Sequence, residues 1–326
     1  MTPGTVPPDE ATLLERGWAA LPASYRIPPE APPLEAARAY CRDLATSHYE
    51  NFPVVTRFLP RPLRPHFYAL YAYCRIADDL GDEVGDTAAS LALLRLWGAE
   101  LDACYEGRAR HPVFVALAET IRACGIPKEP FADLLAAFRQ DQVVTRYASM
   151  EEVLGYCRYS ANPVGRLVLY LCGEASPEKF RLSDATCTAL QLANFWQDVT
   201  RDWAKGRVYL PQDEMRRFGV SDATIASGRS TPEFRALILH EVAYARGLFE
   251  QGRPLARLVQ PELAIDLELF SRGGLEVLRA IERQGGDVLN RRPALSKGAM
   301  LRLALRAAAG RLLLIGRGGS RPGKAA

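Results

Sequence analysis

The chain has 326 residues, a formal net charge of +3 and a hydrophobic fraction of 48%. This apolar content supports a sizeable core and excludes a mostly disordered chain. The near-neutral charge lacks the basic excess expected of a nucleic-acid-binding protein, so we expect no nucleic-acid partner. Because no run of about 18 uncharged apolar residues occurs, we also expect no transmembrane helix.

The N-terminal segment, residues 1–33, holds eight of the 23 prolines. Proline fixes φ and lacks a backbone donor, so this segment is predicted to be an irregular arm with one short helix near residues 10–20. Over residues 34–300, apolar side chains recur every three or four positions, and Pro and Gly separate roughly eight to ten helices. We therefore predict an all-α protein. The basic tail, residues 301–326, either lies on anionic lipid or continues a core helix into solvent.

The stretch HFYALYAYCRIADDLGD carries ionisable side chains on one face of a predicted helix. At about 100° per residue, Tyr71 and Arg75 share this face with three acids, Asp78, Asp79 and Asp82. Three neighbouring carboxylates repel one another unless cations compensate them. A solvated acidic helix end is the alternative, but such an end more often places lysine four residues from each acid.

A second oxygen-rich face follows about 120 residues later, in LQLANFWQDVTRDWAKGRVYLP. Its members Asn194, Asp198 and Asp202 are spaced by four residues, and their flanks are apolar and aromatic. Carboxylate and amide oxygens suit magnesium, which usually takes few protein ligands and completes its shell with water and phosphate. Two such faces directed into one cavity predict magnesium ions over a diphosphate. No Glu-x-x-His pair suggests a di-iron site, and no glycine-rich loop suggests a nucleotide cofactor.

Seven cysteines are scattered along the chain without a Cys-x-x-Cys pair. This pattern favours neither a disulfide framework nor a structural zinc site, and it is typical of a reducing cytoplasm. The first residues also lack the apolar stretch of a secretory signal. We expect a cytoplasmic protein whose tail allows peripheral contact with a membrane.

The two acidic motifs and the GRVYLP that follows the second resemble the squalene/phytoene synthase family, over about residues 40–297. The resemblance implies an all-α isoprenoid-synthase bundle, with two facing Asp-rich helices around an apolar cavity. It assigns the catalytic domain to residues 34–300. It also implies a magnesium-dependent enzyme that cleaves an isoprenoid diphosphate, with no nicotinamide cofactor.

Within that family, the segments HYENFPV, NFWQDV and RGGLEVL are similar to a narrower branch, the bacterial hydroxysqualene synthases. Such an enzyme converts presqualene diphosphate and water to hydroxysqualene and diphosphate in hopanoid biosynthesis. Its pathway partners are a presqualene diphosphate synthase and a hydroxysqualene dehydroxylase. Three departures from other relatives support this branch: Tyr49-Glu50-Asn51 replaces a Ser-x-Ser, Gln197 replaces an arginine, and Arg201 stands where an acid is common.

Two other functions stay open on the sequence. The chain could instead make presqualene diphosphate, squalene or phytoene from farnesyl or geranylgeranyl diphosphate. It could also be a non-catalytic helical assembly factor, although such a relative is expected to lose its metal-binding acids, and this chain retains them.

The resemblance implies roles for individual residues. The magnesium ligands are predicted to be Asp78, Asp79, Asp82, Asn194, Asp198 and Asp202. The diphosphate is predicted to contact His48, Arg75, Arg207, Arg292 and Lys297. The predicted catalytic residues are Tyr71 and Tyr156, whose ring faces stabilise a carbocation, and Gln191, which positions water or the diphosphate. Ordinary surface charge is the alternative for Arg292 and Lys297, and core packing is the alternative for the tyrosines.

Overall fold

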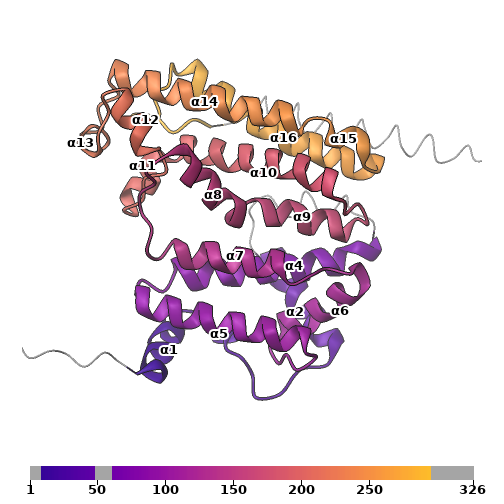
Figure 1. Ribbon diagram of the computed structural model, residues 1–326. Helices are drawn as coiled ribbons and strands as arrows, with labels where there is room; N and C mark the ends of the chain where they lie inside the picture. Colours follow the sequence, from indigo (N-terminus) through magenta and orange to yellow (C-terminus); the bar gives the residue numbers. More distant parts are fainter. Residues whose placement is uncertain (1–8, 48–60, 295–326) are drawn as a thin grey trace, which may run out of the picture. The chain divides into compact units, whose positions relative to one another are not determined.

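The computed structural model describes residues 9–47 and 61–294. All the regular elements in these two ranges are helices, and one isolated bridge joins Arg146 to Val208. The all-α prediction is confirmed. The helices divide between two compact units that meet in the chain at Val144 and Thr145 (Figure 1). The predicted domain of residues 34–300 therefore contains two units.

The first unit contains the long helix that carries the first acidic motif. Its helices are α1 (Glu10–Ala19), η1 (Ala23–Tyr25), α2 (Leu34–Ser47), η2 (Arg61–Leu63), α4 (Arg64–Asp82), α5 (Thr87–Tyr105), α6 (Pro112–Cys124) and α7 (Glu129–Gln140). The Asp9 carboxylate accepts a hydrogen bond from the Thr12 backbone N–H at 2.7 Å and so caps α1. Helix α1 packs on α5, and Trp18, Leu21 and Tyr25 are buried, so the proline-rich segment contributes three side chains to the core of this unit.

An aromatic cluster fills the centre of the first unit. The Trp97 ring of α5 lies 4.5 Å from Phe114 of α6 and 4.8 Å from His111, centroid to centroid. From α4, the buried Tyr73 donates its hydroxyl to the Phe131 carbonyl oxygen at 2.7 Å. Helix α4 thereby contacts α2, α5, α6 and α7, and these contacts hold its acidic C-terminal end in place.

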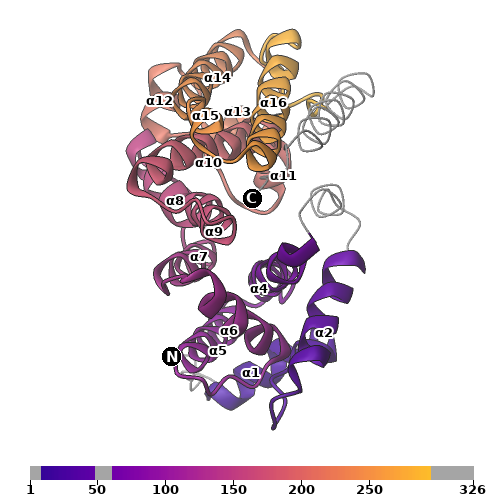
Figure 2. The ribbon, with the colours of Figure 1, turned by 90° about the vertical axis from the view of Figure 1, so that its right-hand side faces the viewer.

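The second unit is built around the helix that carries most of the second motif. Its helices are α8 (Met150–Ser160), α9 (Asn162–Leu171), α10 (Pro177–Gln197), α11 (Val199–Ala204), α12 (Gln212–Arg217), α13 (Asp222–Ala226), α14 (Pro232–Gly252), α15 (Leu255–Leu258) and α16 (Pro261–Arg283). Helix α10 packs against α9, α14 and α16, and α14 and α16 also pack against each other (Figure 2).

Two glycines set how closely these helices approach. A Cβ atom on Gly252 of α14 would lie 2.0 Å from Oγ1 of Thr186 and 2.9 Å from the Leu182 carbonyl oxygen, both on α10. On α16, a Cβ at Gly274 would lie 2.4 Å from the Phe249 ring of α14. These separations are shorter than van der Waals contact, so α10, α14 and α16 pack in this way only because both positions lack a side chain.

All seven cysteines lie among the described residues, and none forms a disulfide. Cys41, Cys104 and Cys157 are buried, and burial raises the pKa of each of these thiols to about 12. These thiols are therefore protonated at neutral pH and pack as small apolar side chains.

Candidate functional site

The three acids of the first motif differ in their surroundings. Asp78 and Asp82 lie exposed at the C-terminal end of α4, whereas Asp79 is only 4% exposed. Because Asp78 and Asp82 are four residues apart on one helix, their carboxylates occupy the same face. This end of α4 therefore presents two accessible carboxylates beside a third that is buried.

The buried Asp79 is held by a tyrosine and an arginine. Its Oδ2 accepts hydrogen bonds from the Tyr25 hydroxyl at 2.7 Å and from Nε of Arg75 at 3.1 Å, while a second Arg75 nitrogen lies 2.6 Å from Oδ1. Arg75 also reaches to within 4.0 Å of Asp78. The guanidinium thus supplies the positive charge that the clustered carboxylates need, and it is itself partly exposed.

Burial and contact with Asp79 shift the pKa values of both Tyr25 and Arg75. Burial, assisted by the hydrogen bond to Asp79, raises the pKa of the Tyr25 phenol well above its ordinary value, so the hydroxyl stays a donor. Burial lowers the pKa of the Arg75 guanidinium, but the Asp79 carboxylate outweighs that effect and leaves the pKa raised. Tyr25 was not among the residues predicted from the sequence.

The second motif spans the junction between α10 and α11. The sequence predicts one helix through Asn194, Asp198 and Asp202, but regular helix stops at Asp198, which has φ −108° and ψ 17°. Backbone hydrogen bonds of 2.9 Å still join Asp198 N–H to the Asn194 oxygen and Asp202 N–H to the Asp198 oxygen. Asn194 is exposed and Asp202 partly exposed, whereas Asp198 is 8% exposed.

Arg292 forms a two-pronged ion pair with Asp198. Its Nε donates to Asp198 Oδ1 at 2.6 Å and a terminal nitrogen donates to Oδ2 at 3.0 Å. The hydrogen bond to Asp198 raises the pKa of the Arg292 guanidinium. This planar, bidentate geometry suits arginine far better than lysine. In each unit, therefore, the buried acid of the motif is paired with one of the predicted arginines.

Gln197 fixes the segment that carries Arg292. The buried Gln197 side chain donates through Nε2 to the Pro293 carbonyl oxygen at 2.6 Å. This bond holds residues 292–293 against the end of α10, directly beside Asp198. The sequence identified Gln197 only as a departure from other relatives, and the structure shows which contact the amide makes.

An aromatic cluster surrounds Tyr156 in the second unit. The Tyr156 ring is 4% exposed, and its centroid lies 5.6 Å from Tyr147, 5.7 Å from Tyr209 and 6.1 Å from Phe195. Phe195 and Tyr209 stack at 3.8 Å. Tyr147 and Tyr209 come together because the Val208 N–H donates to the Thr145 oxygen at 2.9 Å. Of these rings, sequence reasoning selected Tyr156 alone; the Tyr209 in GRVYLP was the available signal for a second.

The remaining predicted residues are less closely grouped. Tyr71 is a partly exposed residue of α4, and Gln191 is a partly exposed residue of α10. Arg207 is partly exposed, and its backbone N–H donates to the Asp202 carbonyl oxygen at 2.8 Å. His48 and Lys297 lie outside the described residues.

The exposed and half-exposed oxygens fit magnesium in their chemistry. Residues 9–47 and 61–294 hold no group of three or more His, Cys, Asp or Glu side chains arranged to bind a metal. Magnesium does not need three protein ligands in one group, because it commonly takes one or two carboxylates and obtains its other ligands from water and phosphate. The carboxylates of Asp78, Asp82 and Asp202 are the accessible hard donors that would serve it.

None of the helices in the described ranges is both long enough and apolar enough to span a membrane.

Comparison with known proteins places the chain in a family. The squalene/phytoene synthase family matches residues 45–299. Hydroxysqualene synthase of Rhodopseudomonas palustris is 34% identical over 241 residues, which cover 73% of this chain and 81% of that protein. Phytoene synthase 3 of Zea mays is 32% identical over 244 residues, 72% of this chain, although the match spans only 57% of the maize protein.

Solved structures agree with this assignment. The crystal structure of squalene synthase HpnC from Alicyclobacillus acidocaldarius superposes with a TM-score of 0.74 at 46% sequence identity, covering 82% of this chain and 98% of that one. A dehydrosqualene synthase solved with a ligand superposes with a TM-score of 0.76 at 25% identity, covering 87% of this chain and 98% of that one.

The helical fold and the family match thus define an all-α protein of isoprenoid metabolism. More narrowly, the chain belongs to the squalene/phytoene synthase family, whose members are enzymes that bind and process isoprenoid diphosphates.

Proposed function

We propose that this chain is a magnesium-dependent hydroxysqualene synthase that converts presqualene diphosphate and water to hydroxysqualene and diphosphate. The observation that carries this proposal is the 34% identity to a hydroxysqualene synthase over 81% of that protein's length. The 46% identity to the HpnC squalene synthase structure supports a bacterial enzyme that forms a C30 product.

In the proposed reaction, the carbon–oxygen bond to the diphosphate breaks and its electron pair leaves with the diphosphate. After rearrangement of the carbocation, a water oxygen forms the new carbon–oxygen bond and a proton passes to the solution. When bound, magnesium supplies Lewis-acid neutralisation of the departing diphosphate. Its proposed ligands are Asp78, Asp82, Asn194, Asp198 and Asp202. Asp79 is either shared among the ions or acts by holding Arg75 in place.

The protein's own cations and aromatic rings complete the proposed site. Arg75 and Arg292, each already next to an acid, would contact the diphosphate, as would Arg207, His48 and Lys297. The ring faces of Tyr71 and Tyr156 would stabilise the carbocation, an attraction of about 2 kcal/mol in a dry setting. The buried rings around Tyr156 would limit access of bulk water, which otherwise captures the cation too early.

Product analysis tests the reaction directly. Purified full-length chain with magnesium is given presqualene diphosphate in one tube and farnesyl diphosphate in another, both in water enriched in oxygen-18 and without nicotinamide. A labelled C30 alcohol formed from presqualene diphosphate alone is the expected result. An unlabelled product, or no C30 alcohol, would contradict water capture.

The main alternative is synthesis of presqualene diphosphate, squalene or phytoene from two shorter diphosphates. It is favoured by the 32% identity to the maize phytoene synthase. In this case the farnesyl diphosphate tube yields a C30 product, or a third tube with geranylgeranyl diphosphate yields a C40 product, and the presqualene diphosphate tube yields no C30 alcohol. A non-catalytic assembly role is not favoured, because the chain belongs to a family of enzymes and retains its acids.

Metal binding can be measured without turnover. We expect magnesium together with inorganic diphosphate to raise the melting temperature of the full chain, and Asp82→Asn or Asp202→Asn to reduce that rise. Asp43→Asn on α2 makes the same change of charge at an exposed position outside both motifs and serves as the control. An equal rise in all four proteins would contradict the proposed ligand set.

A further inference from the structure

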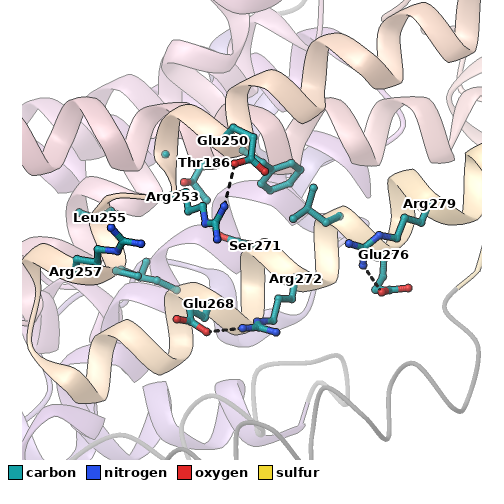
Figure 3. A pocket seen from close by; sticks show the side chains of 15 residues that line it. Thr186, Glu250, Arg253, Leu255, Arg257, Glu268, Ser271, Arg272, Glu276 and Arg279 are labelled. Carbon is teal, nitrogen blue, oxygen red and sulfur yellow. Dashed lines mark hydrogen bonds and ion pairs between the residues drawn. The ribbon is translucent and has the colours of Figure 1, made fainter.

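A pocket in the second unit lies apart from the predicted site residues. Its volume is about 450 Å³, and it opens among α10, α14, α15 and α16 (Figure 3). None of the predicted metal, diphosphate or catalytic residues lines it. The volume falls within the range of about 300–1,000 Å³ that is typical of small-molecule sites.

Part of the pocket lining is apolar. Phe249 of α14 and Leu255 of α15 contribute buried side chains, and Leu267 and Leu275 contribute partly exposed ones from α16. An apolar chain placed against these side chains would remove hydrocarbon surface from water, which favours binding. The pocket therefore favours a ligand with a hydrocarbon portion.

The polar part of the lining is rich in arginine. Three of the arginines pair with a glutamate on their own helix or at its end: Arg253 with Glu250 at 3.4 Å, Arg272 with Glu268 at 2.9 Å, and Arg279 with Glu276 at 2.6 Å (Figure 3). The three arginines are exposed, and ion pairs of exposed side chains contribute little to stability. Their guanidinium groups can therefore turn towards an incoming anion with little loss of free energy.

Arg257 adds a positive charge that no glutamate of the pocket neutralises. It lines the pocket from α15, its side chain is exposed, and it forms no ion pair with any residue in the described part of the chain. Four arginines thus face three glutamates around the pocket. The guanidinium fork matches two oxygens of a phosphate or carboxylate, so the pocket presents a site for an oxyanion beside a site for hydrocarbon.

We propose that this pocket binds an amphiphile whose phosphate or carboxylate head contacts Arg257 and whose apolar chain packs on Phe249, Leu255 and the leucines of α16. The head can belong to a lipid in a bilayer or to a free amphiphile, since the recognised chemistry is the same. The inference does not depend on the proposed reaction, because the pocket shares no residue with the predicted catalytic site.

Binding of decyl phosphate below its micellar concentration, measured by calorimetry on the full chain without magnesium, tests the proposal. We expect saturable binding, weakened at least tenfold by Arg257→Glu. Arg229→Glu makes the same charge change in the exposed loop between α13 and α14 and should bind like the wild type. Equal weakening by both variants would show non-specific charge attraction and overturn the site.

A second variant tests the pocket without changing its charge. Ser271→Trp places a large ring at a lining position of α16, and we expect it to reduce decyl phosphate binding at least tenfold while the circular dichroism spectrum stays that of a helical protein. Unchanged binding by Ser271→Trp would overturn the assignment to this pocket. This variant also decides the matter if Arg257→Glu fails to fold, with Arg257→Gln as the milder replacement.

Further probes separate the two parts of the ligand and its two sources. Decanol and inorganic phosphate should each bind more weakly than decyl phosphate, whereas equal binding by either would contradict an amphiphile site. Flotation with phosphatidylcholine vesicles, with and without phosphatidic acid, identifies the source. Vesicle binding that needs both phosphatidic acid and Arg257 supports a membrane lipid, and binding of soluble decyl phosphate alone supports a free amphiphile.

Discussion

The Tyr25 hydroxyl joins the segment after α1 to the acidic end of α4 through a single hydrogen bond to Asp79. Tyr25→Phe removes the donor and leaves Asp79 paired with Arg75, one nitrogen of which lies 2.6 Å from Oδ1. We expect the free energy of unfolding to fall by about 1–2 kcal/mol, because a buried carboxylate loses a hydrogen bond. Urea denaturation measures this change.

Tyr40→Phe is the matched control for that experiment. The Tyr40 hydroxyl donates to the Ser24 carbonyl oxygen at 2.9 Å in a more exposed setting, so its loss should be smaller. A Tyr25→Phe protein as stable as the wild type would show that the bond to Asp79 contributes nothing net to the fold.

Gln197 tests how Arg292 is positioned. Gln197→Leu removes the hydrogen bond to the Pro293 oxygen and frees the segment that holds Arg292 on Asp198. If the proposed function holds, we expect kcat/KM for presqualene diphosphate to fall about tenfold, because misplacement of a charged group lowers reactivity steeply. Gln251→Leu, an identical change at an exposed position of α14, should leave it unchanged.

Sequence reasoning located the acidic residues and Arg75, but it missed Tyr25 as a partner of Asp79 and the contact that Gln197 makes. The i, i+4 spacing of Asp78 and Asp82 was enough to place them on one face of a helix, and α4 is that helix. Tyr25 lies 54 residues from Asp79 in a short 3₁₀ turn, where no periodicity signals a contact. Gln197 donates to a backbone carbonyl oxygen. Because every residue has such an oxygen, the amino-acid type at position 293 could not indicate the contact.

At the level of helices, α14 carries two glycines in contrasting surroundings. Gly252→Ala would place a methyl group 2.0 Å from Oγ1 of Thr186, so we expect the free energy of unfolding to fall by about 1–3 kcal/mol through overpacking. Gly247 has no neighbour within 4 Å, so Gly247→Ala should raise the free energy of unfolding by about 0.5–1 kcal/mol through helix propensity.

Thermal and urea denaturation of both variants give the comparison, since the two substitutions add the same methyl group to one helix. Changes of the same sign would contradict the packing of α10 on α14 that Gly252 permits.

The periodicity of the sequence predicted the helices themselves, because amphipathic faces follow the 3.6-residue repeat. It did not predict which glycines allow close approach, since that depends on residues 66 positions apart, such as Thr186 and Gly252.

Across the whole molecule, two buried groups have displaced pKa values that make stability depend on pH: His111 in the first unit and Glu241 in the second. In the first unit, burial lowers the pKa of His111 from 6.5 to about 4. The unfolded state therefore binds more protons than the folded state between pH 6.5 and 4, and stability falls as the pH falls through this window. In the second unit, burial raises the pKa of Glu241 from 4.5 to about 8, assisted by the nearby Glu214 and Asp213.

Glu241 has the opposite dependence on pH. Both of its carboxyl oxygens are buried without a hydrogen-bond partner in the described structure, so the folded state holds its proton more tightly than the unfolded state. Stability therefore falls as the pH rises from 4.5 to 8. We expect Glu241→Gln to lessen this loss by up to about 5 kcal/mol, since each pKa unit between 4.5 and 8 corresponds to about 1.4 kcal/mol.

Urea denaturation at several pH values measures both changes in stability. His111→Asn keeps an acceptor for the Val113 N–H that caps α6 and should lessen the loss of stability on the acid side only. Glu241→Gln should act only between pH 4.5 and 8, the range in which the wild-type stability falls as the pH rises. A parallel shift of the whole pH profile in either variant would indicate a change in packing rather than in titration.

The protonated cysteines make the two units distinguishable to a chemical reagent. Four cysteines lie in the first unit, at positions 41, 74, 104 and 124, and three lie in the second, at positions 157, 172 and 187. An alkylating reagent attacks the thiolate, so buried thiols with raised pKa values acquire a label only when the surrounding helices open. Peptide mass spectrometry after brief labelling in rising urea would therefore reveal which half of this chain opens first.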